Sequence, residues 1–159
     1  MEKVGIRFRS YLTDDLDRMH ALDVVCFEST FRFSRDAMRR FSEAVNARVT
    51  IAEEEDELVG FVILHIEEVE KERVGYIVTL DVSLERRRRG IAGRLMQEAE
   101  RQASLEGCSA LVLHVFTGNE AAIRFYASHG FVRSHREGDF YGPRIDAWAF
   151  HKLLTSPSE

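Results

Sequence analysis

The sequence predicts an α/β fold of mixed α+β character, in which a twisted mixed sheet of about seven strands is flanked by about four helices. Apolar strand-like runs alternate with amphipathic helical patterns along the whole chain. A strand, a helix and a second strand lie between Val74 and Phe116, which predicts parallel strands with a right-handed crossover. A length of 159 residues with 45% apolar content suits one buried core. We therefore expect a single domain over residues 1–154 and a flexible tail at 155–159.

The first part of the chain predicts one strand and two helices. Apolar and polar residues alternate over Val4–Arg9, as in a half-buried strand. Thr13 is a suitable N-cap for a helix that runs to about Phe27. Ser34 caps a second helix. Apolar residues recur at helical spacing in this second helix, namely Met38, Phe41 and Val45.

The middle of the chain predicts three strands. Arg48–Glu54 and Glu57–Ile66 are joined by an acidic turn, and the nearly continuous apolar sequence of the second strand predicts a central place in the sheet. A charged turn over Glu67–Arg73 leads into a strand over Val74–Val82. The alternation in that strand places five residues on one face, Val74, Tyr76, Val78, Leu80 and Val82.

The last part predicts a helix, a strand, a second helix and an antiparallel hairpin. The first helix carries an inward stripe of apolar residues, Ile91, Leu95, Met96, Ala99 and Ala103. A strand follows over Ala110–Phe116. Asn119 opens the second helix and Gly130 ends it. Phe131–Arg136 and Ile145–Leu153 pair as the closing hairpin.

Composition argues against several classes of partner. A net charge of −5 is unfavourable for a protein that binds nucleic acid. The N-terminal segment lacks the apolar core of a signal peptide, and no stretch approaches ~18 apolar residues, so we expect no membrane association and a cytoplasmic location. The two cysteines, Cys26 and Cys108, match no metal-ligand spacing, and no metal site is expected.

The stretch Leu80–Met96 has the layout of an anion site. A strand ends at Val82, four arginines follow over Arg86–Arg89, and Gly90 precedes a helix. The first amides of a helix have no intrahelical acceptor, and the helix dipole is positive there, so this turn predicts a pyrophosphate site. The alternative is a turn whose arginines are simply solvated.

These residues resemble the GCN5-related N-acetyltransferase family (GNAT). The family signature is Arg or Gln, two residues, Gly, one residue, then Gly or Ala, and Arg87, Gly90 and Ala92 match it. A second motif follows a later strand, and five residues match it in order, Asn119, Ala122, Tyr126, Gly130 and Phe131. The resemblance implies the GNAT fold, including a parallel strand pair that splays apart.

The resemblance implies acetyl-CoA as the cofactor. Backbone amides over the turn hold the pyrophosphate, with Arg87, Arg88, Gly90, Ala92 and Gly93 as the residues concerned. The strand edge at Leu80 and Val82 pairs with the pantetheine arm, and Asn119 hydrogen-bonds it. Tyr126 protonates the leaving thiolate as a general acid. Leu84 departs from the pattern, since many members carry Pro there. Asn119 is also a plain N-cap, and a core role for Tyr126 is the alternative reading.

Three segments resemble protein N-terminal acetyltransferases of the NatE type. They are YIVTL at Tyr76–Leu80, LHV at Leu113–Val115 and NEAAIRFY at Asn119–Tyr126. In that subgroup the tyrosine and histidine at the positions of Tyr76 and His114 act as the catalytic base pair. The bacterial ribosomal-protein alanine acetyltransferases are similar more generally, but typically carry Glu where His114 stands. The alternative is that His114 is an ordinary strand histidine.

The resemblance also indicates where an acceptor would bind. Phe27 would form an apolar wall for the first side chain of a peptide, with Val78 as a further contact. Phe140 and Tyr141 lie in the last hairpin loop, where Tyr141 would hydrogen-bond the peptide backbone. The subgroup usually has Pro after Phe27 and two adjacent tyrosines in the hairpin loop, so this chain departs at Glu28 and Phe140.

We therefore expect an acetyl-CoA-dependent N-acetyltransferase that acts by direct attack of an amine in a ternary complex. The favoured acceptor is the α-amine of a protein or peptide. Glu28 could instead attract a cationic small amine of the polyamine or aminoglycoside kind. A CoA-sensing module without turnover is the alternative from another class. A monomer or a homodimer is expected, and the sequence identifies no auxiliary subunit.

Overall fold

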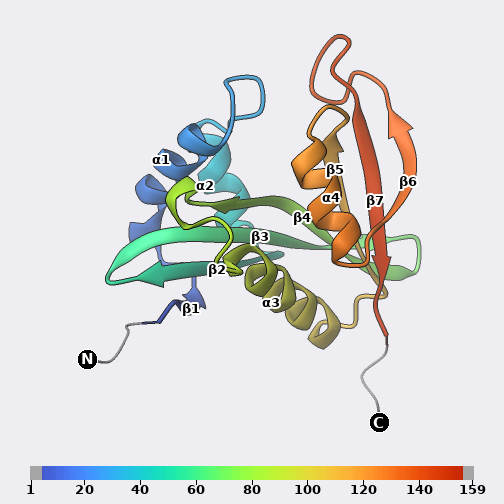
Figure 1. The fold of residues 1–159 in the computed structure, drawn as a ribbon. Helices are drawn as coiled ribbons and strands as arrows, with labels where there is room; N and C mark the ends of the chain where they lie inside the picture. The colour runs from blue at the N-terminus through green and yellow to red at the C-terminus, as the bar shows by residue number, and fades with distance from the viewer. Residues whose placement is uncertain (1–4, 156–159) are drawn as a thin grey trace. The chain divides into compact units, whose positions relative to one another are not determined.

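The computed structural model describes residues 5–155 and contains four α-helices and a seven-stranded sheet. The strands are β1 (Arg7–Ser10), β2 (Ala47–Glu54), β3 (Glu57–Val69), β4 (Glu72–Val82), β5 (Ala110–Phe116), β6 (Val132–Glu137) and β7 (Ala147–Leu153). The helices are α1 (Leu16–Cys26), α2 (Arg35–Glu43), α3 (Ile91–Leu105) and α4 (Glu120–Ser128) (Figure 1). The strand order is β1-β2-β3-β4-β5-β7-β6, and β4 runs parallel to β5. The predicted mixed α/β fold is confirmed.

The chain forms two compact units. The first comprises the chain up to His65 together with Val78–Gln102, and the second comprises Ile66–Ile77 together with the chain from Ala103 onward. The single domain expected over residues 1–154 stays a prediction. Of the tail expected at 155–159, only Thr155 belongs to the described residues, and the first residue of the predicted strand Val4–Arg9 also lies outside them.

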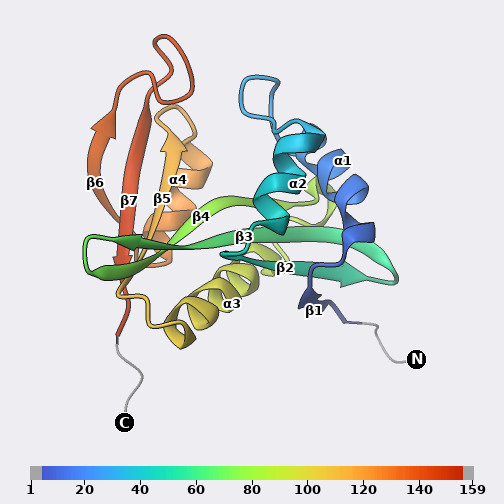
Figure 2. The same ribbon diagram turned by 180° about the vertical axis from the view of Figure 1, so that it is seen from behind.

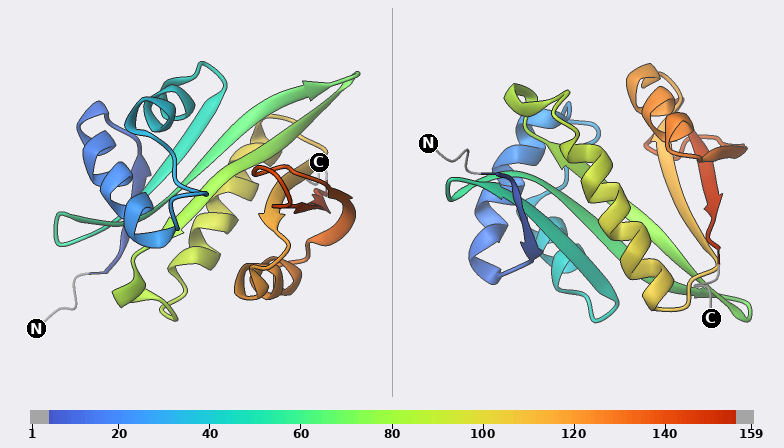
Figure 3. Two further views of the ribbon diagram at one scale, coloured as in Figure 1. Left: turned by 90° about the horizontal axis from the view of Figure 1, so that it is seen from above. Right: turned by 60° about the horizontal axis from the view of Figure 1, so that its bottom comes forward.

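In the first unit, helices cover both faces of the β2–β3 pair (Figure 3). One core cluster joins α1 and α2 to alternate residues of the two strands, and it consists of Leu16, Met19, Met38, Val49, Ile51, Leu58, Phe61 and Ile63. The opposite strand face meets α3, whose predicted apolar stripe is buried throughout. On that side Gln102 donates a hydrogen bond to Thr50 at 3.2 Å. The period-2 pattern of β2 and β3 is therefore used twice, once for each layer of helices.

The start of α1 differs from the sequence expectation. Thr13 does not cap the α-helix, because Thr13–Asp15 forms a 3₁₀ turn and α1 begins at Leu16. The carboxylate of Asp15 accepts the backbone N–H of Leu12 at 2.8 Å and both guanidinium N–H groups of Arg9 at 2.8 Å. A tertiary ion pair thus decides the geometry of this turn, and local cap preference does not.

The second helix begins as expected and ends earlier. Ser34 Oγ accepts the backbone N–H of Ala37 at 3.1 Å, which confirms the predicted N-cap. Met38 is fully buried, whereas Val45 lies beyond the end of α2 and is 97% exposed. Placing Val45 on the apolar face was therefore wrong.

The β3–β4 hairpin is longer than the sequence suggests. β3 extends to Val69 and β4 begins at Glu72, so the predicted charged turn over Glu67–Arg73 is mostly strand. The residues left for the turn are Glu70, which has a φ of 59°, and Lys71. Charged residues at the exposed end of a hairpin need no burial, so hydrophobicity alone misplaces the turn.

Gly60 is required where β3 approaches the end of β4. A Cβ atom at this position would lie 2.9 Å from the backbone oxygen of Asp81 and 3.2 Å from Leu95. The first of these contacts is with backbone, which cannot rotate away. The amide of Ser83 also donates to Val59 O at 2.8 Å, so this close approach holds the strand that leads into the arginine turn.

In the second unit, β5, β7 and β6 are neighbours and α4 covers one face of these strands (Figures 1 and 2). Asn119 Oδ1 accepts the amide of Ala122 at 3.1 Å, and α4 ends at Ser128, two residues before Gly130, whose φ is 90°. The amide of Phe131 returns to Tyr126 O at 3.0 Å, which is the C-terminal cap that the sequence predicted. Antiparallel pairing of β6 with β7 confirms the closing hairpin.

A buried pair of carboxyl groups joins α1 to β4 in the first unit. Asp23 and Asp81 are 0% and 1% exposed. Asp23 accepts the backbone N–H of Phe33 at 2.9 Å, and Asp81 accepts the hydroxyl of Thr79 at 2.7 Å. Burial, together with the neighbouring Asp23, raises the pKa of Asp81 well above its ordinary value. The protonated form of Asp81 is therefore favoured, and the contacts of the two residues tie the loop before α2 and the end of β4 to α1.

We predict that Gly60→Ala destabilises the protein by about 1–3 kcal/mol, because the new methyl group overlaps backbone that cannot move independently. The measurement is chemical denaturation of both proteins at one temperature. Gly5→Ala is the matched control, since no atom lies within 4 Å of a Cβ there. Equal stability of the Gly60 and Gly5 variants would contradict the close approach.

We predict that Asp81→Asn makes stability less sensitive to a rise in pH. A carboxyl group with a raised folded-state pKa keeps a proton that the unfolded chain releases, so its contribution to stability falls as pH rises above the unfolded pKa. Asparagine keeps the acceptor for Thr79 and adds an N–H donor for Asp23. Thermal unfolding between acidic and neutral pH, with Asp36→Asn as the control, should show the smaller decline only in the Asp81 variant.

Candidate active site

Tyr76 and His114 form a hydrogen-bonded pair in the second unit. The Tyr76 hydroxyl lies 2.7 Å from His114 Nδ1, and the ring centroids are 5.6 Å apart. The strand register explains this contact, because Tyr76 is paired with Val112 on β5 and His114 lies two residues further along the same face. Burial is the main cause of a raised pKa at Tyr76. The two residues that the sequence analysis predicts to act together as the catalytic base are therefore in contact.

The pairing of β4 with β5 ends at this point. Within the described residues the pairs are Val74↔Ala110, Gly75↔Leu111 and Tyr76↔Val112. β5 continues to Phe116, and all of its residues pair with β7 on the other edge. Such an early end of the pairing is what a splayed parallel pair requires.

Two aromatic residues of the last loop pack on one side of His114. The Phe140 ring stacks on the imidazole, with 4.1 Å between centroids and 15° between planes. Tyr141 packs edge-on against Phe140 at 4.9 Å, and burial raises the pKa of Tyr141 to about 12. The structure thus brings four predicted site residues into one cluster, which we call the Tyr76–His114 cluster: Tyr76, His114, Phe140 and Tyr141.

Glu137 lies beside this cluster, and sequence reasoning missed it. Its Oε1 lies 3.1 Å from His114 Nε2 and 3.0 Å from His135 Nε2. The two histidines lower the pKa of Glu137. In the β7 register His114 and His135 both oppose Ala149, and Glu137 follows His135 by two residues on β6. Only the tertiary register reveals this, since His135 and Glu137 match no spacing with His114 in the sequence.

Asn119 and Tyr126 lie on α4. Asn119 caps the helix through its side-chain oxygen, which leaves its N–H donors for other partners. Tyr126 is half-buried and packs edge-on against Phe125 at 5.3 Å and Phe131 at 5.6 Å. These contacts fit the core reading of Tyr126, while its partial exposure also leaves room for an active-site role.

In the first unit, two of the four arginines are neutralised locally. Glu54 binds both Arg86, at 2.9 Å, and Arg89, at 2.6 Å, and Glu57 binds Arg86 at 2.8 Å. The Arg89 contact holds the pKa of Glu54 at about 2. Arg86 and Arg89 thus hold the turn against the β2–β3 hairpin, which differs from the alternative reading in which the arginines are simply solvated. Arg87 and Arg88 have no such ion pair among the described contacts and are exposed.

The backbone of this turn has the features that a pyrophosphate needs. Arg88 and Gly90 adopt φ values of 69° and 77°, and a Cβ atom at Gly90 would meet nothing within 4 Å. The amide of Arg94 donates to Gly90 O at 3.1 Å, which is the first intrahelical hydrogen bond of α3. The amides of the α3 residues before Arg94 therefore have no intrahelical acceptor. Ala92 and Gly93, which belong to that first turn, are half-buried. The residues present therefore fit the predicted phosphate group.

Other predicted residues of the first unit lie around the end of β4. Leu80 is half-buried, but the alternation stops there because Asp81 and Val82 are both buried. The carbonyl of Val82 accepts the Cys26 thiol at 3.3 Å. Burial raises the pKa of that thiol to about 11, and burial also raises the pKa of the Cys108 thiol. Neither cysteine is therefore an activated nucleophile.

The acceptor residues predicted in the first unit lie on α1's C-terminal loop and on β4. Phe27 is half-buried, and its carbonyl accepts Arg32 Nε at 2.7 Å. Glu28 is exposed. Val78 packs against the α1–α2 core cluster. Phe140 and Tyr141 belong to the second unit.

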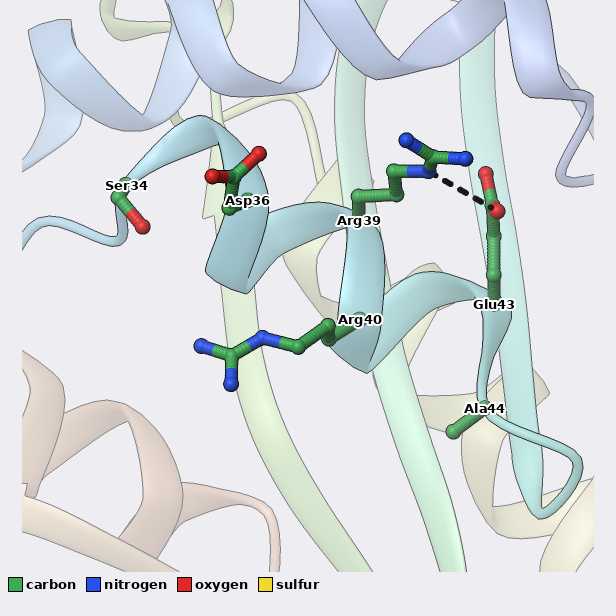
Figure 4. A pocket seen from close by; sticks show the side chains of 6 residues that line it. All are labelled: Ser34, Asp36, Arg39, Arg40, Glu43 and Ala44. Carbon is green, nitrogen blue, oxygen red and sulfur yellow. Dashed lines mark hydrogen bonds and ion pairs between the residues drawn. The ribbon is translucent and has the colours of Figure 1, made fainter.

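A hollow that contains none of these residues lies over α2 (Figure 4). Its volume is about 780 Å³, and its lining consists of Ser34, Asp36, Arg39, Arg40, Glu43 and Ala44. Arg39 is paired with Glu43 at 3.5 Å across it. Because this hollow is shallow, charged with both signs and free of every predicted site residue, we do not assign the chemistry to it.

No group of His, Cys, Asp or Glu side chains in residues 5–155 has the arrangement of a metal site. None of the helices there has the length and apolar content needed to span a lipid bilayer.

Comparisons with known proteins identify the family and the fold. Residues 16–131 match the model of a family described as "Acetyltransferase (GNAT) family". No curated protein sequence gives a significant match to this chain.

Solved structures resemble the chain over nearly its whole length. Arabidopsis thaliana NAA60 in complex with acetyl-CoA is 27% identical, with a TM-score of 0.84 over 94% of this chain and 99% of that one. Arabidopsis thaliana NAA50 in complex with the bisubstrate analogue CoA-Ac-MVNAL is 26% identical, with a TM-score of 0.78 over 94% and 99%. The ribosomal-protein-S18-alanine N-acetyltransferase of Escherichia coli is 19% identical, with a TM-score of 0.82 over 98% and 97%, and shows the shared fold alone.

Proposed function

Because the chain belongs to the GNAT acetyltransferase family, we propose that it transfers the acetyl group of acetyl-CoA to the N-terminal α-amine of a protein or peptide. The enzyme class and the cofactor follow from the family. The acceptor is the part that the proposal adds. The single observation that carries it is the 2.7 Å contact between the Tyr76 hydroxyl and His114 Nδ1.

The Tyr76–His114 pair suits the removal of a proton from an amine. Bound acetyl-CoA supplies an acetyl thioester. As the amine nitrogen bonds the acetyl carbon, the Tyr76 oxygen would take a proton from that nitrogen. The hydroxyl proton of Tyr76 would then pass to His114 Nδ1. Tyr126 would donate a proton to sulfur when the carbon–sulfur bond breaks. Direct transfer is favoured because burial keeps both cysteine thiols protonated.

The cofactor assignments remain proposals for each unit. In the first unit, the amides from Arg87 to Gly93 would hold the pyrophosphate, with Arg88 as a further cation and the β4 backbone at Leu80 and Val82 facing the pantetheine. In the second unit, the side-chain N–H groups of Asn119 would serve the same arm. The open space at Gly90 supports the phosphate assignment.

A peptide acceptor is favoured over a small amine. The NAA60 and NAA50 structures are more than a quarter identical to this chain, and the NAA50 complex holds a bisubstrate analogue that includes the peptide sequence MVNAL. The aromatic pair Phe140 and Tyr141 beside His114 suits a peptide backbone and an apolar first side chain. Phe27 and Val78 would add apolar contacts in the first unit.

One observation supports a cationic small amine as a second candidate acceptor. Glu28 is exposed and carries no described ion pair, so it is available to a cationic small amine. The CoA-sensing alternative is disfavoured, because a sensor has no need for a hydrogen-bonded Tyr76–His114 pair. The cytoplasmic location, the monomeric or homodimeric state and the absence of nucleic acid and membrane partners stay predictions.

We predict that peptides with a free N-terminus support faster release of CoA thiol than polyamines or aminoglycosides do. A panel of peptides that differ in their first two residues, with N-acetylated versions as controls, measures kcat/KM. Higher kcat/KM for the small amines would replace the peptide proposal with the second candidate. No turnover in either panel, with a clear rise of Tm on adding acetyl-CoA, would favour the sensor.

We predict that His114→Ala and Tyr76→Phe each lower kcat by about 10²-fold, the contribution expected of a positioned base. The affinity for acetyl-CoA, measured by calorimetry, should change little because neither side chain belongs to the proposed phosphate site. His20→Ala is a control in the other unit. Unchanged kcat in both variants would remove the base assignment while leaving the enzyme class intact.

A further inference from the structure

Glu137 lies against the proposed base and has no role in the scheme above. Its Oε1 is 3.1 Å from His114 Nε2, on the ring edge opposite the Tyr76 hydroxyl. The His114 side chain is 14% exposed and that of Glu137 is 38% exposed, so water screens this contact only in part. His114 Nε2 is buried and has no aligned hydrogen bond among the described residues, so the carboxylate is its charged neighbour.

The position of this carboxylate restricts where the imidazole carries its proton. A neutral histidine has one N–H and one ring lone pair. A lone pair at Nε2 would face an anionic oxygen at 3.1 Å, which is repulsive, whereas an N–H at Nε2 is attracted to it. With the proton at Nε2, the lone pair is at Nδ1, where the Tyr76 hydroxyl donates at 2.7 Å.

Glu137 is itself held in place. His135 Nε2 forms a hydrogen bond with the same Oε1 at 3.0 Å. His135 and Glu137 lie on the same face of β6, because they are two residues apart on the strand. The stacked Phe140 ring fixes the plane of the imidazole, so the carboxylate meets its ring edge and not its face.

We propose that Glu137 is the positioning residue of His114, which keeps the Nδ1 lone pair directed at Tyr76 and stabilises the protonated imidazole that forms when the pair accepts a proton. This inference rests on the proposed function only for its kinetic consequence. The arrangement of protons in the resting protein follows from the contacts alone.

Other charged or titratable groups face the same cluster. Tyr141, Glu137 and Glu67 each contribute to the raised pKa of Tyr76. His135 contributes to the lowered pKa of Glu137. A change at Glu137 therefore leaves Glu67 as a remaining carboxylate near Tyr76. Glu67 is present in the wild type and in every Glu137 variant, so differences between them report on Glu137 alone.

We predict that the population of the His114 tautomer with a proton at Nδ1 rises in the order wild type, Glu137→Gln, Glu137→Lys. Glutamine removes the charge but keeps an acceptor oxygen. Lysine places a cation beside His114 Nε2, which favours a lone pair at Nε2 and therefore a proton at Nδ1. Nitrogen-15 NMR of the full chain labelled at histidine measures both ring nitrogens, and His114→Ala assigns the signals. Glu68→Gln is the control, because it removes an exposed carboxylate that pairs with Arg73 at 3.3 Å.

The kinetic test uses the best acceptor from the peptide panel. Glu137→Gln should lower kcat about tenfold with little change of KM for acetyl-CoA, because the Nδ1 lone pair of His114 is then directed at Tyr76 in a smaller fraction of the molecules. Glu137→Asp should restore part of kcat. Glu68→Gln should behave as wild type.

Two outcomes would overturn the proposal. One is an unchanged tautomer signal in folded Glu137→Gln and Glu137→Lys, and the other is an unchanged kcat in Glu137→Gln. If Glu137→Lys fails to fold, the glutamine variant decides. A shifted tautomer in a protein without peptide turnover would support the role of Glu137 while rejecting the proposed acceptor, so the two failures are distinguishable.

Discussion

The parallel contact between β4 and β5 covers three residue pairs and ends at Tyr76↔Val112, and the proposed chemistry depends on this end point. Tyr76 is the last residue of β4 that β5 holds in register. His114 lies just beyond, on a strand that β7 pairs along its full length. The tyrosine hydroxyl and the imidazole therefore meet at 2.7 Å because backbone hydrogen bonds fix both strands. A longer pairing would occupy the β5 edge beyond Val112, which has no further β4 partner among the described residues.

Carboxylates control the state of the functional groups in both units. Glu137 faces His114 Nε2 in the second unit, while Glu54 and Glu57 neutralise Arg86 and Arg89 in the first. These glutamates explain how a run of four arginines exists in a chain of net charge −5 without forming a general basic surface. The turn then leaves its backbone amides, Arg87 and Arg88 for an anion, and the proposed phosphate site would depend on geometry more than on total charge.

Local signals in the sequence predicted the elements that local physics controls. The caps at Ser34 and Asn119 are confirmed, because a side-chain oxygen two or three residues before a free amide needs no tertiary partner. The bounds of β5 and the buried stripe of α3 are confirmed for a similar reason, since a single period determines them. Thr13 failed as a cap because the Asp15–Arg9 ion pair joins residues of different elements.

The sequence by itself determined the α/β fold, the family motifs and the residue types of the site, because periodicity, caps and the Arg87–Gly90–Ala92 spacing are properties of neighbours along the chain. Only the tertiary structure decided which of these residues meet. It joined Tyr76 to His114, and it added Glu137 and His135 through a strand register that no local pattern specifies. It also buried Asp23 against Asp81, since the burial of a charge depends on what packs around it and not on its own neighbours in sequence.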